Sequence, residues 1–268
     1  MKILFLGDVV GVSGCSKIMN NLRAEIEKKK IDFVIVNGEN AAEDGLGITN
    51  KIAKNLFSCG VNVITSGNHI WDKKETLTYI KKEKRLLRPY NSFAPVPGKG
   101  FNIFRLNNGY KIGVLNLMGN IFMKKCDNVF KIAKNFLKKY TLKKDYDFLV
   151  LDFHAETNIE KMAMGHFFDG KATLVVGTHT HVPTNDVRIL ENGTAYQTDA
   201  GMSGNYDTVM GYNKDIFIKK FLKEDLKKNF PVSGNISLCG LIVDADVNTG
   251  LVNKVQNFIF GGTLKNSQ

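Results

Sequence analysis

The sequence predicts an α/β protein in which two mixed β-sheets pack on each other with helices outside. In the first half, short apolar segments alternate with helical patterns, which is typical of parallel strands covered by helices. Later, paired apolar segments flank turn signals such as Asn107-Asn108-Gly109, which indicates hairpins. Because no repeat or Pro/Ser-rich linker divides the 268 residues, we expect one domain over residues 1–268.

Buried strands and helices account for the first half of the chain. Continuous apolar runs predict strands over residues 3–6, 33–36 and 61–65. Apolar residues spaced every four, from Ile18 to Ile26, predict a helix that ends in a lysine run. The next helix has Thr49 as a candidate N-cap and Gly60 as its stop, and a third is expected over about 73–82. Polar groups that follow these strands should therefore share one edge of a sheet.

The later segments predict further strands with two helices among them. Strands are expected over residues 101–106, 110–117, 148–151, 174–176, 187–190, 194–197, 236–243 and 251–260. Helices are expected over residues 129–137 and 160–168. The last residues, 265–268, are expected to fray.

The composition indicates a globular protein with excess positive charge. Apolar residues make up 43% of the chain, and 37 basic against 26 acidic residues give a net charge of +11. This charge attracts anions such as nucleotides and RNA. Most of the excess is lysine near the ends of predicted helices, where it complements the helix dipole, so a solvated surface is favoured over a dedicated polyanion patch.

Cysteine use and hydropathy predict a cytoplasmic protein with no membrane partner. The four cysteines have no C-x-x-C spacing and do not resemble a disulfide framework, which fits a reducing compartment. Asp8 interrupts the first apolar run far short of a signal peptide, and no run approaches the ~18 residues of a membrane span.

Side chains that can bind metal follow the predicted strands. They are Asp8, Glu39, Asn40, Asn68, His154, His179 and His181. Two carboxylates, two amides and three imidazoles are too many for one tetrahedral zinc ion, but they suit two divalent ions that share a carboxylate. Such a mixed nitrogen and oxygen set favours iron, manganese or zinc over magnesium or calcium.

Each member of this set also has a structural explanation. Asp8 could be a turn residue, and Asn40 could form an Asx-turn. His179 and His181 stand two apart, and in an extended segment they would face the same side. His166 lies in a helical stretch, and we interpret it as structural.

His69 is distinct because it directly follows Asn68. If Asn68 binds metal, His69 points towards substrate and can act as the general acid for a departing oxygen. Asp72 could orient His69, although its place before a predicted helix favours an N-cap. The glycines of residues 11–14 and 45–47 could let the backbone approach a phosphate, but the sequence has no P-loop, dinucleotide fingerprint or nucleophile elbow.

In order and spacing, five motifs resemble those of the calcineurin-like metallophosphoesterase superfamily. They are Gly7-Asp8, Gly38-Glu39-Asn40, Gly67-Asn68-His69, Phe153-His154 and Gly177-Thr178-His179-Thr180-His181. Two departures from the superfamily, Val10 in place of a histidine and Glu39 in place of an aspartate, match its YmdB-like subgroup of phosphodiesterases that act on 2′,3′-cyclic nucleotides. The stretch Thr198-Asp199-Ala200-Gly201-Met202 is also similar to that subgroup.

The resemblance implies a four-layer αββα sandwich and a pair of ions, with iron or manganese as the metal. One ion would be held by Asp8, Glu39, Asn40 and His181. The other would be held by Asn68, His154, His179 and the same Glu39, which would bridge the two. His69 would be the catalytic histidine.

The sequence thus predicts a phosphodiesterase with two divalent ions that hydrolyses 2′,3′-cyclic nucleotides by attack of a metal-bridging hydroxide. A phosphomonoesterase or a nuclease would use the same chemistry, and the sequence does not decide among these three functions. An RNA-binding regulatory protein with a structural metal site is the alternative from another class, and the +11 charge is its main support. The sequence leaves open whether the protein binds RNA and whether it forms a homo-oligomer.

Overall fold

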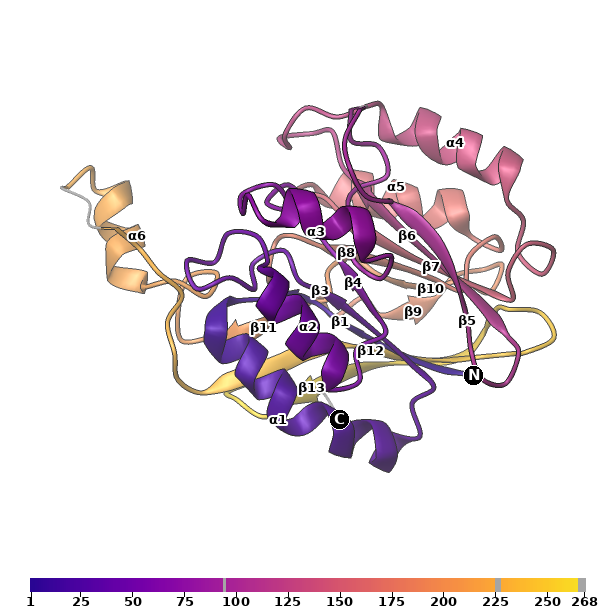
Figure 1. Cartoon of the computed structure of the whole chain (residues 1–268), viewed down its shortest axis with the longest axis horizontal. Helices are drawn as coiled ribbons and strands as arrows, with labels where there is room; N and C mark the ends of the chain where they lie inside the picture. The colour runs from indigo at the N-terminus through magenta and orange to yellow at the C-terminus, as the bar shows by residue number, and fades with distance from the viewer. Residues whose placement is uncertain (94, 225–227, 265–268) are drawn as a thin grey trace.

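Two β-sheets lie face to face, with helices on the outer face of each (Figure 1). This computed structural model describes residues 1–93, 95–224 and 228–264, so the predicted fraying of residues 265–268 lies outside the described residues. The predicted α/β class and αββα layering are confirmed.

The first sheet has seven strands in the order β2-β11-β12-β1-β3-β4, with β13 on β12. Its strands are β1 (Lys2–Leu6), β2 (Asp8–Val9), β3 (Phe33–Asn37), β4 (Val63–Thr65), β11 (Met202–Asn205), β12 (Ile236–Ala245) and β13 (Val252–Phe260). The strands β1, β3 and β4 are parallel, as predicted, and β12 is antiparallel to β1. The carboxyl ends of the three parallel strands therefore open on one edge.

The second sheet has six strands in the order β5-β6-β7-β8-β10-β9. They are β5 (Phe101–Arg105), β6 (Lys111–Met118), β7 (Phe148–His154), β8 (Leu174–Thr178), β9 (Arg188–Ile189) and β10 (Ala195–Gln197). The four central strands are parallel, and the hairpin partners β5 and β9 run antiparallel at the two edges.

Strand alternation builds three apolar layers. In β1, Ile3 and Phe5 belong to the core between the sheets, while Leu4 and Leu6 belong to the core under the helices. Helices α1 (Gly11–Lys29) and α2 (Asn50–Ser58) cover the first sheet, and α4 (Val129–Lys139) and α5 (Asn158–Phe168) cover the second. Burial on both faces explains why the strands read as unbroken apolar runs.

The structure corrects two predicted helix starts. Helix α1 begins at Gly11, so residues 11–14 form its first turn rather than a phosphate-binding loop. Gly14 is required there because a Cβ would lie 2.3 Å from the carbonyl oxygen of Ser203 on β11. Helix α3 (Thr76–Lys82) begins three residues later than predicted, and Asp72 does not cap it because its carboxylate is paired with His69.

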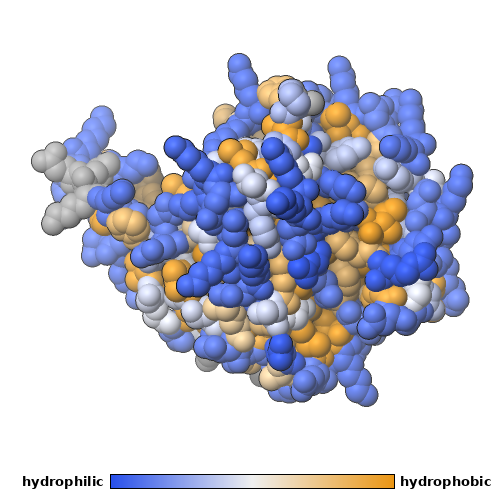
Figure 2. All heavy atoms as spheres, in the orientation of Figure 1, coloured by the Kyte–Doolittle hydropathy of each residue, from blue (hydrophilic) through white to orange (hydrophobic). Residues whose placement is uncertain are grey.

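Three elements were missed: the short strands β2 and β11, and α6 (Lys214–Phe221). Helix α6 stands away from the sandwich and has no buried residue (Figure 1). Hydrophilic side chains cover most of the face drawn in Figure 2. Among the described residues, no helix is both long and apolar enough to cross a membrane.

Candidate metal centre

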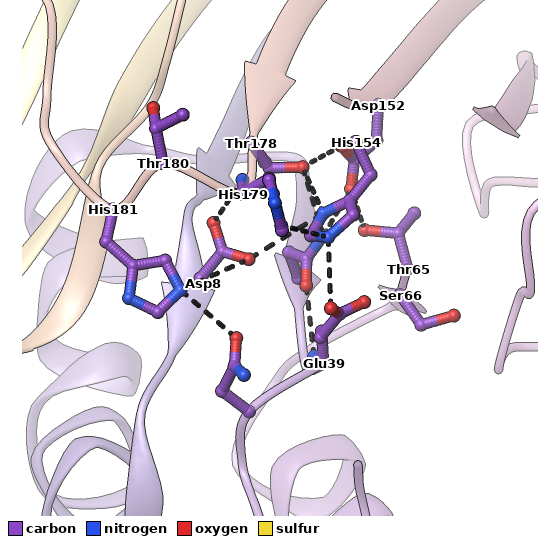
Figure 3. Close-up of polar contacts among 12 residues, drawn as sticks. Asp8, Glu39, Thr65, Ser66, Asp152, His154, Thr178, His179, Thr180 and His181 are labelled. Atoms are coloured by element: carbon purple, nitrogen blue, oxygen red, sulfur yellow. Dashed lines mark hydrogen bonds and ion pairs between the residues drawn. The ribbon is translucent and has the colours of Figure 1, made fainter. Parts of the chain in front are cut away.

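The ends of strands from both sheets bring the predicted ligands together. Asp8 begins β2, Glu39 and Asn40 follow β3, Asn68 follows β4, His154 ends β7, and His179 and His181 follow β8. Figure 3 shows the side chains of Asp8, Glu39, His154, His179 and His181 turned towards one another. The candidate metal centre therefore lies where the carboxyl ends of the parallel strands of the two sheets meet.

One group of donors surrounds His154. Its Nε2 lies 3.0 Å from Glu39 Oε1 and 3.1 Å from His179 Nδ1. The ligand atoms of these three residues all lie within 4.8 Å of one another, a spacing that could hold a metal ion. Both His154 and Glu39 are 1% exposed, so the group is closed to bulk water on their side.

A second group of donors surrounds His181. Its Nε2 lies 3.2 Å from Asn40 Oδ1 and 3.9 Å from Asp8 Oδ1. Asp8 Oδ1 also lies 3.8 Å from His154 Nδ1, so this carboxylate stands between the two groups. The geometry thus offers two neighbouring sets of nitrogen and oxygen donors.

Several buried oxygens of this centre have no partner among the described residues. Asp8 Oδ1, Glu39 Oε2 and Asn68 Oδ1 are buried and accept no hydrogen bond there. A buried carboxylate or amide oxygen without a partner is costly, and a bound cation removes that cost. Gly67 leaves the necessary space, because a Cβ at this residue would lie 2.0 Å from Glu39 Oε2 and 2.3 Å from His154 Nε2. The donor set therefore fits divalent cations.

Hydrogen bonds fix which nitrogen His154 offers. Thr178 Oγ1 donates to Asp152 Oδ1 at 2.7 Å, so its lone pair is free to accept from His154 Nδ1 at 2.9 Å. Nε2 of His154 is then unprotonated and faces Glu39. Asp152 is held in turn by a hydrogen bond from Asn37 Nδ2 at 2.9 Å.

The other two histidines are oriented in the same way. Nδ1 of His181 donates to the carbonyl oxygen of Met210 at 3.1 Å, which leaves Nε2 unprotonated, with its lone pair on the side of Asn40 Oδ1. His179 is reversed, because its Nε2 pairs with Glu156 Oε2 at 3.0 Å and its Nδ1 faces His154. In all three, the nitrogen turned inwards is the one that can bind a metal.

The glycine segment 45–47 orients Asn40 rather than a phosphate. Asn40 Nδ2 donates to the carbonyl oxygen of Gly45 at 2.9 Å, which turns its Oδ1 towards His181. Gly45 and Gly47 both have positive φ, at 75° and 78°, so the turn suits glycine at these positions. The amide orientation of Asn40 is therefore set by the backbone.

Burial shifts the pKa of the central groups in opposite directions. It raises the pKa of Asp8 to about 7, although the charge of His154 opposes this rise, and it raises the pKa of Glu39 to about 7. Burial lowers the pKa of His154 to about 4 and lowers the pKa of both His179 and His181. At neutral pH the imidazoles are therefore neutral, which is the form that binds metal.

The segment of His179 and His181 is not extended, which corrects the predicted strand geometry. Both residues have positive φ, at 98° and 63°. Non-glycine residues rarely adopt this region, and neighbouring groups must hold them there. Asp8 Oδ2 accepts from the backbone N–H of His179 at 3.1 Å, and Asp199 Oδ2 accepts from that of Thr180 at 3.1 Å. This turn, rather than strand alternation, directs His179 to the group around His154 and His181 to the group with Asn40.

His69 stands beside the centre with its own partner. Its Nδ1 lies 2.6 Å from Asp72 Oδ2, and its side chain is 27% exposed. Lys124 Nζ lies 3.6 Å from Asp72 Oδ1 and donates to the carbonyl oxygen of Asn68 at 2.7 Å. Burial raises the pKa of Glu39, and the charge and the backbone of His69 oppose that rise. His166, in contrast, is exposed on α5.

Sequence reasoning missed the residues that support the donors. Asp152, Thr178 and Glu156 orient histidines, and Lys161 forms a fully buried ion pair with Asp199, with Nζ and Oδ2 2.7 Å apart. Asp152 carried a signal, since a carboxylate between Leu151 and Phe153 in an apolar run needs buried partners.

We expect the substitution Thr178→Val to weaken metal binding about 10–100-fold, the usual effect of losing a hydrogen-bond partner behind a metal-binding histidine. Valine keeps the shape but leaves His154 Nδ1 without its acceptor. Titration with Mn²⁺ measures the change. Thr194→Val is the matched control, because Thr194 is a buried threonine that donates to the carbonyl oxygen of Ala172, outside the donor set. Equal affinities in both variants would contradict this role.

The amino-acid sequence is similar to one family model and to named bacterial proteins. A model of YmdB-like proteins matches residues 4–258. The chain belongs to the YmdB-like family. A protein of Bacillus subtilis (strain 168), named 2′,3′-cyclic-nucleotide 2′-phosphodiesterase, is 42% identical over 97% of this chain and 97% of its own length. A putative phosphatase/phosphodiesterase of Mycoplasma pneumoniae is 41% identical over 96% of this chain and 92% of its own length.

Two solved structures agree with the YmdB-like assignment. A hypothetical protein from Thermus thermophilus has a TM-score of 0.89 and 33% identity, and covers 98% of this chain and 100% of its own. A novel phosphatase from Mycoplasma pneumoniae has a TM-score of 0.90 and 37% identity, and covers 98% of this chain and 94% of its own. The predicted family, the fold class and the prediction of an enzyme are confirmed.

Proposed function

We propose that the chain is a metal-dependent phosphodiesterase that hydrolyses 2′,3′-cyclic nucleotides. The observation that carries the proposal is the convergence of buried, unpartnered oxygens with imidazole nitrogens whose free lone pairs face inwards. The name of the Bacillus subtilis relative supports the substrate class and favours opening of the 2′ ester, which would leave a 3′-nucleotide.

Two groups of residues would hold two divalent cations, with iron or manganese favoured and zinc as the alternative. Asp8, Asn40 and His181 would hold one, and Asn68, His154 and His179 the other. Glu39 would contribute to both, as its two oxygens allow: Oε1 faces His154, and Oε2 has no partner among the described residues. When bound, such cations lower the pKa of water and offset the negative charge of a phosphodiester.

His69 would donate the proton that the departing ribose oxygen needs. Its Nδ1 faces Asp72, which leaves Nε2 as the atom that carries the transferred proton. Asp72 would hold the ring in one orientation and stabilise its protonated form. The ammonium group of Lys124, 3.6 Å from Asp72 Oδ1, partly offsets the negative charge of this carboxylate. His69 lies outside the group of Glu39, His154 and His179, whose ligand atoms are all within 4.8 Å of one another, so we assign it to the leaving group rather than to a metal ion.

We expect the affinity for Mn²⁺ to rise between pH 6 and pH 8. The pKa of Asp8 and of Glu39 is about 7 in the metal-free chain, so below pH 7 each carboxyl holds a proton that a cation must displace. His154 does not compete, because its pKa is lowered to about 4. Calorimetry at pH 6 in buffers of different ionisation enthalpy should show release of about one to two protons per chain, and the part of this release that comes from Asp8 and Glu39 should fall towards zero above pH 8. Asp8→Asn should release fewer, and no proton release at pH 6 would contradict the assignment.

A substrate panel with added Mn²⁺ tests the function. We expect kcat/KM to be highest for 2′,3′-cyclic AMP, lower for p-nitrophenyl phosphate and lower for single-stranded RNA, and expect turnover to disappear in Asp8→Asn and Asn68→Ala. Preference for p-nitrophenyl phosphate or RNA would instead support a phosphomonoesterase or a nuclease. RNA binding without turnover of any substrate would support the regulatory alternative.

A further inference from the structure

A largely apolar cavity adjoins the metal centre on the side of Asn68. It has a volume of about 180 Å³, and Gly67 and Asn68 form part of its wall. The same Asn68 carries the unpartnered amide oxygen of the centre, and Gly67 packs against His154. The cavity therefore shares Gly67 and Asn68 with the centre at which we propose that the phosphate binds.

The wall of this cavity suits a flat, uncharged ring. Trp71, Phe93, Val96 and Met118 supply apolar surface, and the described lining residues include no carboxylate. Phe93 is 50% exposed, so its ring is accessible. The volume is below the ~300–1,000 Å³ of pockets that hold drug-sized ligands, which matches one ring system rather than a whole nucleotide.

Two lysines, Lys124 and Lys125, line the cavity, and Lys124 contacts residues next to the metal centre. Lys124 lines the cavity, and its Nζ donates to the carbonyl oxygen of Asn68 at 2.7 Å and lies 3.6 Å from the Asp72 carboxylate that orients His69. A ligand that spans both places therefore has an aromatic end in the cavity and an anionic end at the donors. A nucleotide has this arrangement.

We propose that this cavity, which we call the base subsite, binds the nucleobase of the substrate. This proposal rests on the proposed function, since the phosphate at the metal centre determines what reaches the cavity. Aromatic side chains stack on every base, so the subsite favours substrates that carry a base and discriminates little among the four bases. Trp71 and Phe93 would then determine specificity rather than take part in the chemistry.

Fluorescence tests the base subsite without metal and without turnover. Trp71 is the single tryptophan of the chain, so all tryptophan emission reports on this cavity. Adenosine and 3′-AMP should quench the emission saturably, after correction for absorption, whereas ribose 5-phosphate should leave it unchanged. Absence of saturable quenching, or equal quenching by ribose 5-phosphate, would overturn the proposal.

A variant of Phe93 tests the same cavity through affinity and kinetics. Phe93→Ala should weaken adenosine binding and raise KM for 2′,3′-cyclic AMP by about fivefold or more, the lower end of what base stacking contributes. It should not change kcat/KM for methyl riboside 2′,3′-cyclic phosphate, which lacks the base. The control is Phe221→Ala, because Phe221 is 80% exposed on α6, away from the sandwich (Figure 1).

These measurements separate failure of the base subsite from failure of the proposed function. Hydrolysis of both cyclic phosphates with equal kcat/KM, and no effect of Phe93→Ala, would overturn the subsite while the phosphodiesterase proposal stands. Saturable quenching by adenosine that Phe93→Ala weakens, in a protein that hydrolyses neither compound, would support the subsite and contradict the phosphodiesterase.

Discussion

His69→Ala should lower kcat for 2′,3′-cyclic AMP by about 10²–10⁴-fold, the usual contribution of a general acid. His69 Nδ1 is paired with Asp72 at 2.6 Å, so only Nε2 is available to protonate the departing oxygen. Metal content should stay unchanged, because we assign His69 no role as a ligand. Kinetics with Mn²⁺, together with elemental analysis of the same preparation, give both quantities.

The matched control is His166→Ala, which removes an exposed histidine of α5 and should leave kcat unchanged. Asp72→Asn should lower kcat less than His69→Ala, because asparagine keeps the ring oriented but stabilises its protonated form less. If His69→Ala lost metal and activity together, His69 would be a ligand and the proposed proton transfer would be wrong.

Gly67→Ala should lower metal affinity and kcat/KM together, each by at least about 10²-fold. The added Cβ would lie 2.0 Å from Glu39 Oε2 and 2.3 Å from His154 Nε2, so the methyl group and the donors cannot keep their present positions. Displacement of catalytic groups by about 1 Å is enough for an effect of this size. Titration with Mn²⁺ and steady-state kinetics measure the two losses.

Gly113→Ala provides the control for this substitution. Gly113 lies on β6, and a Cβ there would meet only side-chain atoms, at 3.1–3.3 Å. We expect it to cost about 1–3 kcal/mol of stability through overpacking and to leave metal affinity intact. Wild-type metal affinity in Gly67→Ala would show that the space beside Glu39 and His154 is not needed for a cation.

The strand ends were the most predictable part of this molecule. A parallel strand that is buried on both faces is a continuous apolar run, and the polar residues that follow the run lie at or near the carboxyl end of the strand. That pattern predicted β1, β3, β7 and β8, and with them the positions of Asp8, Glu39, His154 and His179. Because parallel strands share an edge, order along the chain was enough to predict that these side chains meet.

The orientation of the donors could not be predicted in this way. His181 Nδ1 bonds to the carbonyl oxygen of Met210, and a backbone carbonyl carries no signal in the sequence. The turn that converges His179 and His181 depends on Asp8 and Asp199, which come from other parts of the chain. Such contacts depend on tertiary packing, not on local pattern.

Short elements and helix starts were also beyond local pattern. The two-residue strand β2 exists because β11 pairs with it in parallel, from almost two hundred residues further along the chain. Asp72 had the sequence position of an N-cap, but its carboxylate pairs with His69. A residue that can satisfy either a helix end or a neighbouring side chain is assigned only when the neighbour is known.

Anomalous X-ray diffraction from crystals of the protein grown with Mn²⁺ tests directly whether these donors hold two metal ions. We expect two manganese peaks about 3.5–4 Å apart, with Glu39 between them. Asp8, Asn40 and His181 should surround one peak, and Asn68, His154 and His179 the other. A single peak, or peaks remote from these residues, would contradict it.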